Sequence, residues 1–97
     1  MNCSTYHIFF RNLANPVRTS IIGQLKKKES SVSELSEKLG IEQSKLSHAL
    51  TSLKHCNIVV SEQKGKKRIY SLNKKTIIPM LQLIDKHNCN LCGRSIR

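Results

Sequence analysis

Hydrophobic residues in the first 55 positions recur at intervals of three and four, which is the spacing of one helical face. This repeat predicts helices over residues 7–13, 16–28, 32–39 and 43–55. Ser31 and Glu34 match a capping box at the start of the third helix, and Gly40 is the residue type that commonly ends one. Asn57 ends the fourth helix.

The pattern changes after Asn57 to one that is typical of strands. Residues 58–62 and 68–72 are rich in β-forming side chains and flank a turn at 63–66 that contains Gly65. A last helix is predicted over 76–86, with Pro79 in its first turn, where a missing N–H is tolerated. The fold class is therefore α+β, mostly helical, with one two-stranded β-hairpin. Length favours a single domain over 1–97, of which 87–97 is a short tail containing Cys and His.

Two short helices joined at Gly40 form a helix-turn-helix, in which the second helix can enter the major groove of DNA. The polar face at the start of that helix carries amide, hydroxyl and imidazole groups, which can bond base edges. These residues are Gln43, Ser44, Ser47 and His48. From periodicity alone, an ordinary solvent-facing helix surface explains them equally well.

Charge favours the DNA-binding interpretation. The chain has 17 Lys and Arg against 6 Asp and Glu, a formal net charge of +11, which attracts polyanions. Four of the basic residues surround the glycine of the hairpin turn, which is the composition of a wing that contacts the DNA backbone. They are Lys64, Lys66, Lys67 and Arg68.

The segments LANPVRTSII and VSELSEKLGIEQSKLSHALTSLKHCNIVVSEQKGKKRIYSL resemble the ArsR (ArsR/SmtB-type) family of repressors over about residues 9–72. The resemblance implies a winged helix-turn-helix homodimer built on the first and last helices. It also implies that Gln43, Ser44, Ser47 and His48 face bases. Phosphates would be contacted by Lys45, Lys54 and the wing residues. Two positions depart from the family: Glu42 stands where a Ser or Thr cap is usual, and Ser36 replaces an Ala.

The last predicted helix supports dimerisation independently, because its apolar residues cover more than one face. They are Ile77, Ile78, Met80, Leu81, Leu83 and Ile84.

The tail contains His87, Cys89 and Cys92 in an H-x-C-x-x-C-G arrangement, which is half of a zinc site. A fourth ligand would come from Cys3, Cys56, His7 or a partner chain. Redox chemistry and free thiols are the alternatives. Cys56 by itself is expected to be a buried thiol. The metal positions that the family uses are expected to be absent, since residues 33–39 lack cysteine and no His follows Asp85-Lys86-His87.

No apolar run is long enough for a membrane span, and residues 1–15 do not resemble a signal peptide, so we expect a cytoplasmic protein. There the cysteines are expected to be thiols or metal ligands rather than a disulfide framework. No phosphate loop, acid pair or small-molecule site is evident, which argues against an enzyme. The predicted function is a sequence-specific, double-stranded DNA-binding transcriptional regulator, most simply a repressor, responsive to metal or redox state. The alternatives are a constitutive regulator without effector and a zinc-stabilised winged-helix protein-interaction module.

Overall fold

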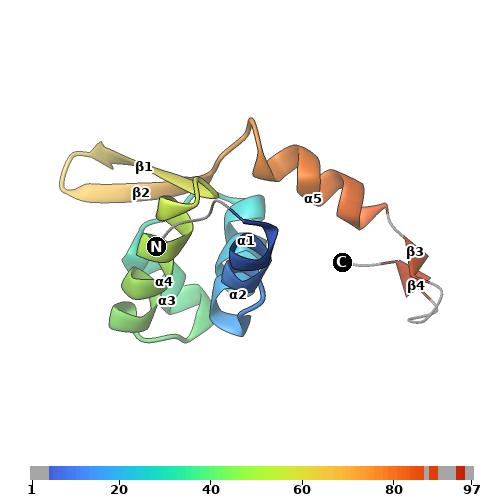
Figure 1. Cartoon of the computed structure of the whole chain (residues 1–97). Coiled ribbons are helices and arrows are strands. Elements are labelled where there is room, and N and C mark those ends of the chain that lie inside the picture. The colour runs from blue at the N-terminus through green and yellow to red at the C-terminus, as the bar shows by residue number, and fades with distance from the viewer. Residues whose placement is uncertain (1–4, 87, 90–93, 96–97) are drawn as a thin grey trace.

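The computed structural model describes residues 5–86, 88–89 and 94–95. Four helices are followed by a hairpin and a fifth helix (Figure 1). The helices are α1 (Tyr6–Leu13), α2 (Pro16–Lys27), α3 (Val32–Leu39), α4 (Gln43–His55) and α5 (Ile77–Asp85). The strands are β1 (Val59–Lys64), β2 (Lys67–Leu72) and the short β3 (Asn88–Cys89) and β4 (Arg94–Ser95). The predicted mostly helical α+β class is confirmed.

Side-chain caps set where the central helices begin and end. The side-chain oxygen Oδ1 of Asn15 accepts hydrogen bonds from the amides of Val17 and Arg18, which starts α2 directly before Pro16. Ser31 and Glu34 form the predicted capping box of α3 in both directions. Gly40 ends that helix with a φ of 66°, a left-handed conformation that glycine adopts without strain.

The core lies where α2, α3 and α4 meet the base of the hairpin. Ile21, Leu35, Leu46 and Leu50 are fully buried there, and Leu39 and Ile41 pack against them as partly buried residues. This packing fixes the angle between α3 and α4. It thereby decides which face of α4 remains in solvent.

The hairpin is longer than predicted. β1 and β2 pair antiparallel from Val59 opposite Leu72 out to Lys64 opposite Lys67. Only Gly65 and Lys66 are left as a two-residue turn, and Gly65 has a φ of 63°. Backbone hydrogen bonds in both directions between Ser30 and Tyr70, of 3.1 and 2.8 Å, tie the hairpin to the loop before α3.

Helix α5 extends away from the other helices in Figure 1. Pro79 lies in its first turn as predicted, and Asp85 at its end forms a salt bridge with Lys26 of α2. The pairing of β3 with β4, Asn88 opposite Ser95, was not predicted from the sequence. No helix among the described residues is long and apolar enough to span a bilayer.

Candidate nucleic-acid interface

Helix α4 has one buried face and one polar face. Leu46, Ala49, Leu50 and Leu53 fill the core. Every residue predicted to read bases is exposed, namely Gln43, Ser44, Ser47 and His48. The structure therefore presents these side chains together on one surface of the first turns of α4, as predicted.

Glu42 occupies the N-cap position of α4 but makes no capping hydrogen bond. Its carboxylate instead accepts a hydrogen bond from the Ser44 hydroxyl, with 2.6 Å between Oε1 and Oγ. The first turn thus lacks the oxygen acceptor that Ser or Thr would supply. The carboxylate of Glu42 also places a negative charge at the N-terminus of α4, which is the end that would approach DNA.

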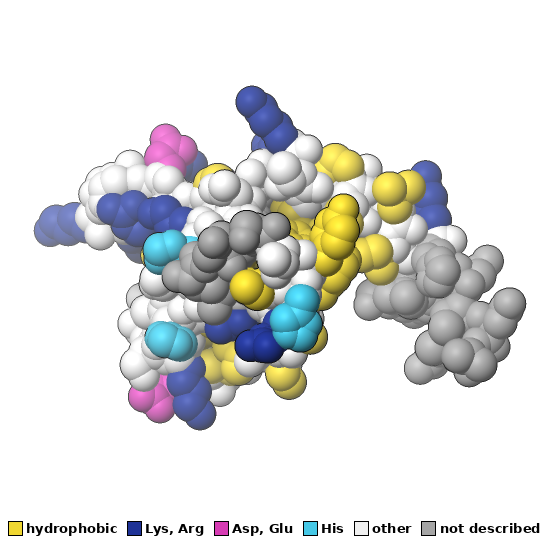
Figure 2. Space-filling model, viewed as in Figure 1, with side chains coloured by type: hydrophobic (Ala, Val, Ile, Leu, Met, Phe, Trp, Pro, Cys, Tyr) yellow, Lys and Arg dark blue, Asp and Glu magenta, His cyan; other side chains and the backbone are white. Residues whose placement is uncertain are grey.

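The hairpin carries the densest positive charge near this surface. Lys66, Lys67 and Arg68 are exposed, and Figure 2 shows Lys and Arg side chains gathered over the projecting hairpin. Lys64 is partly neutralised, because its Nζ lies 3.2 Å from a carboxylate oxygen of Glu29. The hairpin is thus a wing whose tip keeps most of its charge in solvent.

Ser61 of β1 links the wing to the recognition helix. Its Oγ accepts hydrogen bonds from Lys54 Nζ at 2.9 Å and from Arg68 Nη1 at 3.1 Å. The structure therefore directs Lys54 towards the wing. Lys54 is thus grouped with Arg68 of the wing, and not with Lys45, the predicted phosphate contact on the first turn of α4.

A shallow pocket separates the wing from the start of α3. Its lining is hydroxyl-rich and basic, and comprises Ser31, Val32, Ser33, Lys66, Lys67, Arg68 and Tyr70. Hydrogen bonds from the backbone and hydroxyl of Ser31, with Lys67 and Lys28 nearby, hold the pKa of Glu34 below its ordinary value. Glu34 is therefore ionised at neutral pH while it caps α3.

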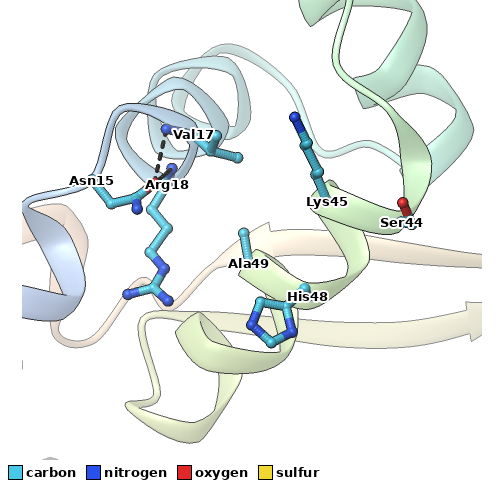
Figure 3. A pocket seen from close by; sticks show the side chains of 7 residues that line it. All are labelled: Asn15, Val17, Arg18, Ser44, Lys45, His48 and Ala49. Carbon is cyan, nitrogen blue, oxygen red and sulfur yellow. Dashed lines mark hydrogen bonds between the residues drawn. The ribbon is translucent and has the colours of Figure 1, made fainter.

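A second cleft, lined partly by residues of α2, was not predicted. It lies between the start of α2 and the first turns of α4 (Figure 3). Arg18 contributes to it, and the buried Asn12 holds this arginine. This buried polar group could not be predicted from the sequence, because Asn12 stands beside the apolar residues of α1 and its partners Ser52 and Cys56 are distant in the chain.

The cysteine predictions are partly corrected. Cys56 is half-buried and disulfide-bonded, so the expectations that it is a buried thiol and that the cysteines are thiols or metal ligands are wrong for this residue. Its sulfur also accepts a hydrogen bond from Asn12 Nδ2 at 2.9 Å. In this state Cys56 has no thiolate to offer as a fourth metal ligand.

Most of the predicted metal ligands fall outside the part of the chain that the structure describes. Cys3, His87 and Cys92 lie outside the described residues, and the side chain of Cys89 is not described although its backbone forms β3. Among the residues that the structure does describe, no three His, Cys, Asp or Glu side chains are grouped to hold a metal ion.

Comparison with known proteins agrees with this architecture. A model of the bacterial regulatory protein arsR family matches residues 15–61. The HTH-type transcriptional regulator NmtR of Mycobacterium tuberculosis is 34% identical over 81% of this chain and 66% of its own length. Rv0081 of the same species, an HTH-type transcriptional regulator, is 35% identical over 80% of this chain and 69% of its own length. The aligned part thus spans about two thirds of these relatives.

Solved structures show the same fold. The crystal structure of Rv0081 superposes with a TM-score of 0.72 at 34% identity, covering 77% of this chain and 76% of that one. A homodimeric winged helix-turn-helix DNA-binding domain, Mb0332 of Mycobacterium bovis, also gives 0.72, over 77% of this chain and 69% of that one. At 23% identity this second match concerns the fold alone.

The helix-turn-helix of α3 and α4, followed by the basic hairpin, defines a winged helix-turn-helix protein, the DNA-binding fold of many transcriptional regulators. The chain belongs to the ArsR family of bacterial regulatory proteins, and the relatives named above are transcriptional regulators rather than enzymes.

Proposed function

We propose that this chain binds double-stranded DNA in a sequence-specific manner and represses transcription by occupying an operator. The observation that carries the proposal is the exposed polar face of α4, which lies beside a basic wing and opposite a fully buried apolar face. A helix so anchored can enter the major groove without disturbing the core.

Within this proposal the contacts divide into two kinds. Gln43, Ser47 and His48 read base edges, because amide, hydroxyl and imidazole groups can bond the major-groove pattern. Lys45 and the wing residues Lys66, Lys67 and Arg68 contact phosphates, which positions α4 but carries no sequence information. Ser44 contacts a base only when its hydroxyl no longer donates a hydrogen bond to Glu42.

The binding unit is a homodimer formed through α1 and α5. Large apolar side chains are exposed on these two helices: Tyr6 by 85%, Phe10 by 56% and Leu83 by 72%. Figure 2 shows hydrophobic side chains over this part of the molecule, away from the wing. Burial in a second copy would remove this surface from water.

Sedimentation equilibrium tests the dimer. The wild-type chain should sediment as a dimer, and Leu83→Glu should shift it towards monomer because the substitution places a carboxylate in the interface. Lys75→Glu, an exposed change in the loop before α5, is the control. If the wild-type chain sediments as a monomer, the proposed homodimer is wrong, and a symmetric operator with two half-sites is no longer expected.

We infer a cytoplasmic location, because the proposed partner is double-stranded DNA. Response to a metal or to redox state is a further part of the proposal, resting on the tail residues His87, Cys89 and Cys92 and on the disulfide-bonded Cys56. Native mass spectrometry of the reduced protein, before and after treatment with a chelator, tests whether zinc is bound.

Selection from a random-sequence duplex library tests the proposed function. The library should converge on a pseudo-palindrome whose two half-sites are spaced by about one helical turn. Failure to enrich any sequence, while the protein remains folded, would contradict sequence-specific binding.

A further inference from the structure

Two cations from different elements meet at the hydroxyl of Ser61 on β1. Its Oγ accepts a hydrogen bond of 2.9 Å from Nζ of Lys54, in the last turn of α4, and one of 3.1 Å from Nη1 of Arg68, on β2. Since both bonds end on one oxygen atom, the two nitrogens are no farther apart than the sum of these lengths. The structure therefore holds an ammonium and a guanidinium side by side between the recognition helix and the wing.

The register of the hairpin explains why these side chains meet. Gln63 of β1 lies directly opposite Arg68 of β2. Ser61 is two residues before Gln63 and shares its face of the strand, which makes Ser61 and Arg68 diagonal neighbours. Val59 is on the same face and is buried in the core. This face of the hairpin is therefore turned towards α4, where Lys54 reaches it.

The positive charges of this pair are not neutralised by an acid. Neither Lys54 nor Arg68 forms a salt bridge with a carboxylate among the residues that the structure describes. Glu62 follows Ser61 in the chain, but its side chain lies on the opposite face of β1, because side chains alternate along a strand. Ser61 is a neutral acceptor and leaves the repulsion between the two cations in place. An anion bound to both would remove that repulsion.

Both cations keep donors for a ligand. An ammonium has three N–H donors and a guanidinium has five, and Lys54 and Arg68 each use one of them on Ser61. Both side chains are exposed, whereas Ser61 is half-buried. A phosphate group presents several oxygens and can accept hydrogen bonds from both cations at once. Because Ser61 already restricts the two side chains, less conformational entropy is lost when a phosphate binds.

The cation pair lies on the same side of α4 as the proposed base-reading surface. Lys54 follows Ser47 by about two helical turns, so the two residues share one stripe of α4 and are about 10 Å apart along its axis. Both are exposed. A phosphate held by Lys54 and Arg68 would therefore flank the bases that α4 contacts.

We propose that Ser61 is a positioning residue that presents Lys54 and Arg68 to one phosphate of the DNA backbone. The inference rests on the proposed DNA binding and deepens it, because it adds Lys54 to the wing contacts and fixes their place relative to α4. Ser61 acts through the two cations and does not touch the phosphate. Since a phosphate contact fixes orientation rather than sequence, the pair sets how α4 lies in the groove.

Substitution of Ser61 tests the positioning role while every charge is kept. Ser61→Ala removes the shared acceptor, and its affinity for a random-sequence duplex should fall by about twofold to tenfold. Ser61→Thr keeps a hydroxyl and should bind as the wild type does. Ser71→Ala is the matched control, because it removes a hydroxyl from the other face of the hairpin. Thermal unfolding of each variant sets a temperature for the binding measurements at which all of them are folded.

A double variant tests whether the two cations hold the same phosphate. Each neutralised phosphate contributes about 0.9 to the slope of log K against log salt. Lys54→Gln combined with Arg68→Gln should lower the slope by about 0.9 per chain, because one phosphate loses both of its cations. Two separate phosphates would give about 1.8, which would overturn the shared contact. Lys74→Gln combined with Lys75→Gln removes the same charge from the exposed loop before α5 and should change the slope far less.

The failures are distinguishable. If the wild-type chain does not bind duplex DNA, both the proposed function and this inference are overturned. If it binds, and Ser61→Ala binds equally well, only this inference is overturned. If inorganic phosphate raises the unfolding temperature of the wild type more than chloride does at equal ionic strength, and the Lys54 and Arg68 double variant abolishes that difference while keeping the wild-type slope, the pair binds a free anion and the DNA contact is overturned.

Discussion

The carboxylate of Glu42 accepts a hydrogen bond from the Ser44 hydroxyl at the start of α4, with 2.6 Å between Oε1 and Oγ. This contact engages one predicted base-reading residue, and the N-terminus of α4 is left without a side-chain cap. Glu42 therefore weakens both the helix start and the attraction of this surface for DNA. Two substitutions of Glu42 separate its effect on helix stability from its effect on DNA affinity.

Glu42→Ser should stabilise the protein by about 1 kcal/mol, because serine supplies the missing cap acceptor. It should also tighten binding to a random-sequence duplex by about twofold to fivefold, equivalent to ~0.5–1 kcal/mol, because one carboxylate per chain is removed from the interface. Urea denaturation and fluorescence anisotropy measure the two changes. Glu42→Gln is the matched control, and it should tighten binding without stabilising the fold.

Asn12→Ala should destabilise the fold by about 1–3 kcal/mol, since Arg18 and the backbone oxygen of Ser52 each lose a buried partner. Chemical denaturation measures this loss. Ser20→Ala removes an exposed hydroxyl that bonds only within α2, and it should change stability by less than about 0.5 kcal/mol. Equal effects of the two substitutions would argue against the buried network.

Lys66→Gln combined with Lys67→Gln should lower the slope of log K against log salt by about 1.8 per chain, because both lysines are placed at phosphates. The relative affinities for a selected and a random duplex should stay the same, since wing contacts carry no base preference in this account. A change in sequence preference would instead place the wing against base edges.

Stability should fall in acid partly through Glu34. The folded chain holds the pKa of this group below its ordinary value, mainly through its hydrogen bonds with Ser31. The stabilisation is therefore present above the unfolded-state pKa and is lost as the pH falls through the folded-state pKa. Glu34→Ala should be less stable than wild type at neutral pH, and the difference should shrink as the pH falls through the folded-state pKa of Glu34. A difference that is constant with pH would contradict the capping role.

Local signals in the sequence predicted most of the fold. The capping box at Ser31 and Glu34, the glycine at position 40 and the leucine repeat of residues 46–53 each specify an element through neighbours in the chain. The polar face of α4 follows from the same periodicity. These predictions needed no knowledge of which elements pack together.

Contacts between distant positions could not be predicted in this way. Asn12 meets Ser52 across 40 residues. The cleft between α2 and α4 was missed for the same reason, since its lining residues share one surface only because α2 packs on α4.

The central claim is that the exposed face of α4 reads DNA sequence. The most direct test measures the affinity of the variant Gln43→Ala, Ser47→Ala, His48→Ala for the selected duplex and for a random one. The account predicts that the preference for the selected duplex falls by at least tenfold while binding to the random duplex persists, because each good base contact contributes about 1–3 kcal/mol of discrimination. An unchanged preference would contradict it and would favour a winged-helix protein-interaction module or a different reading surface.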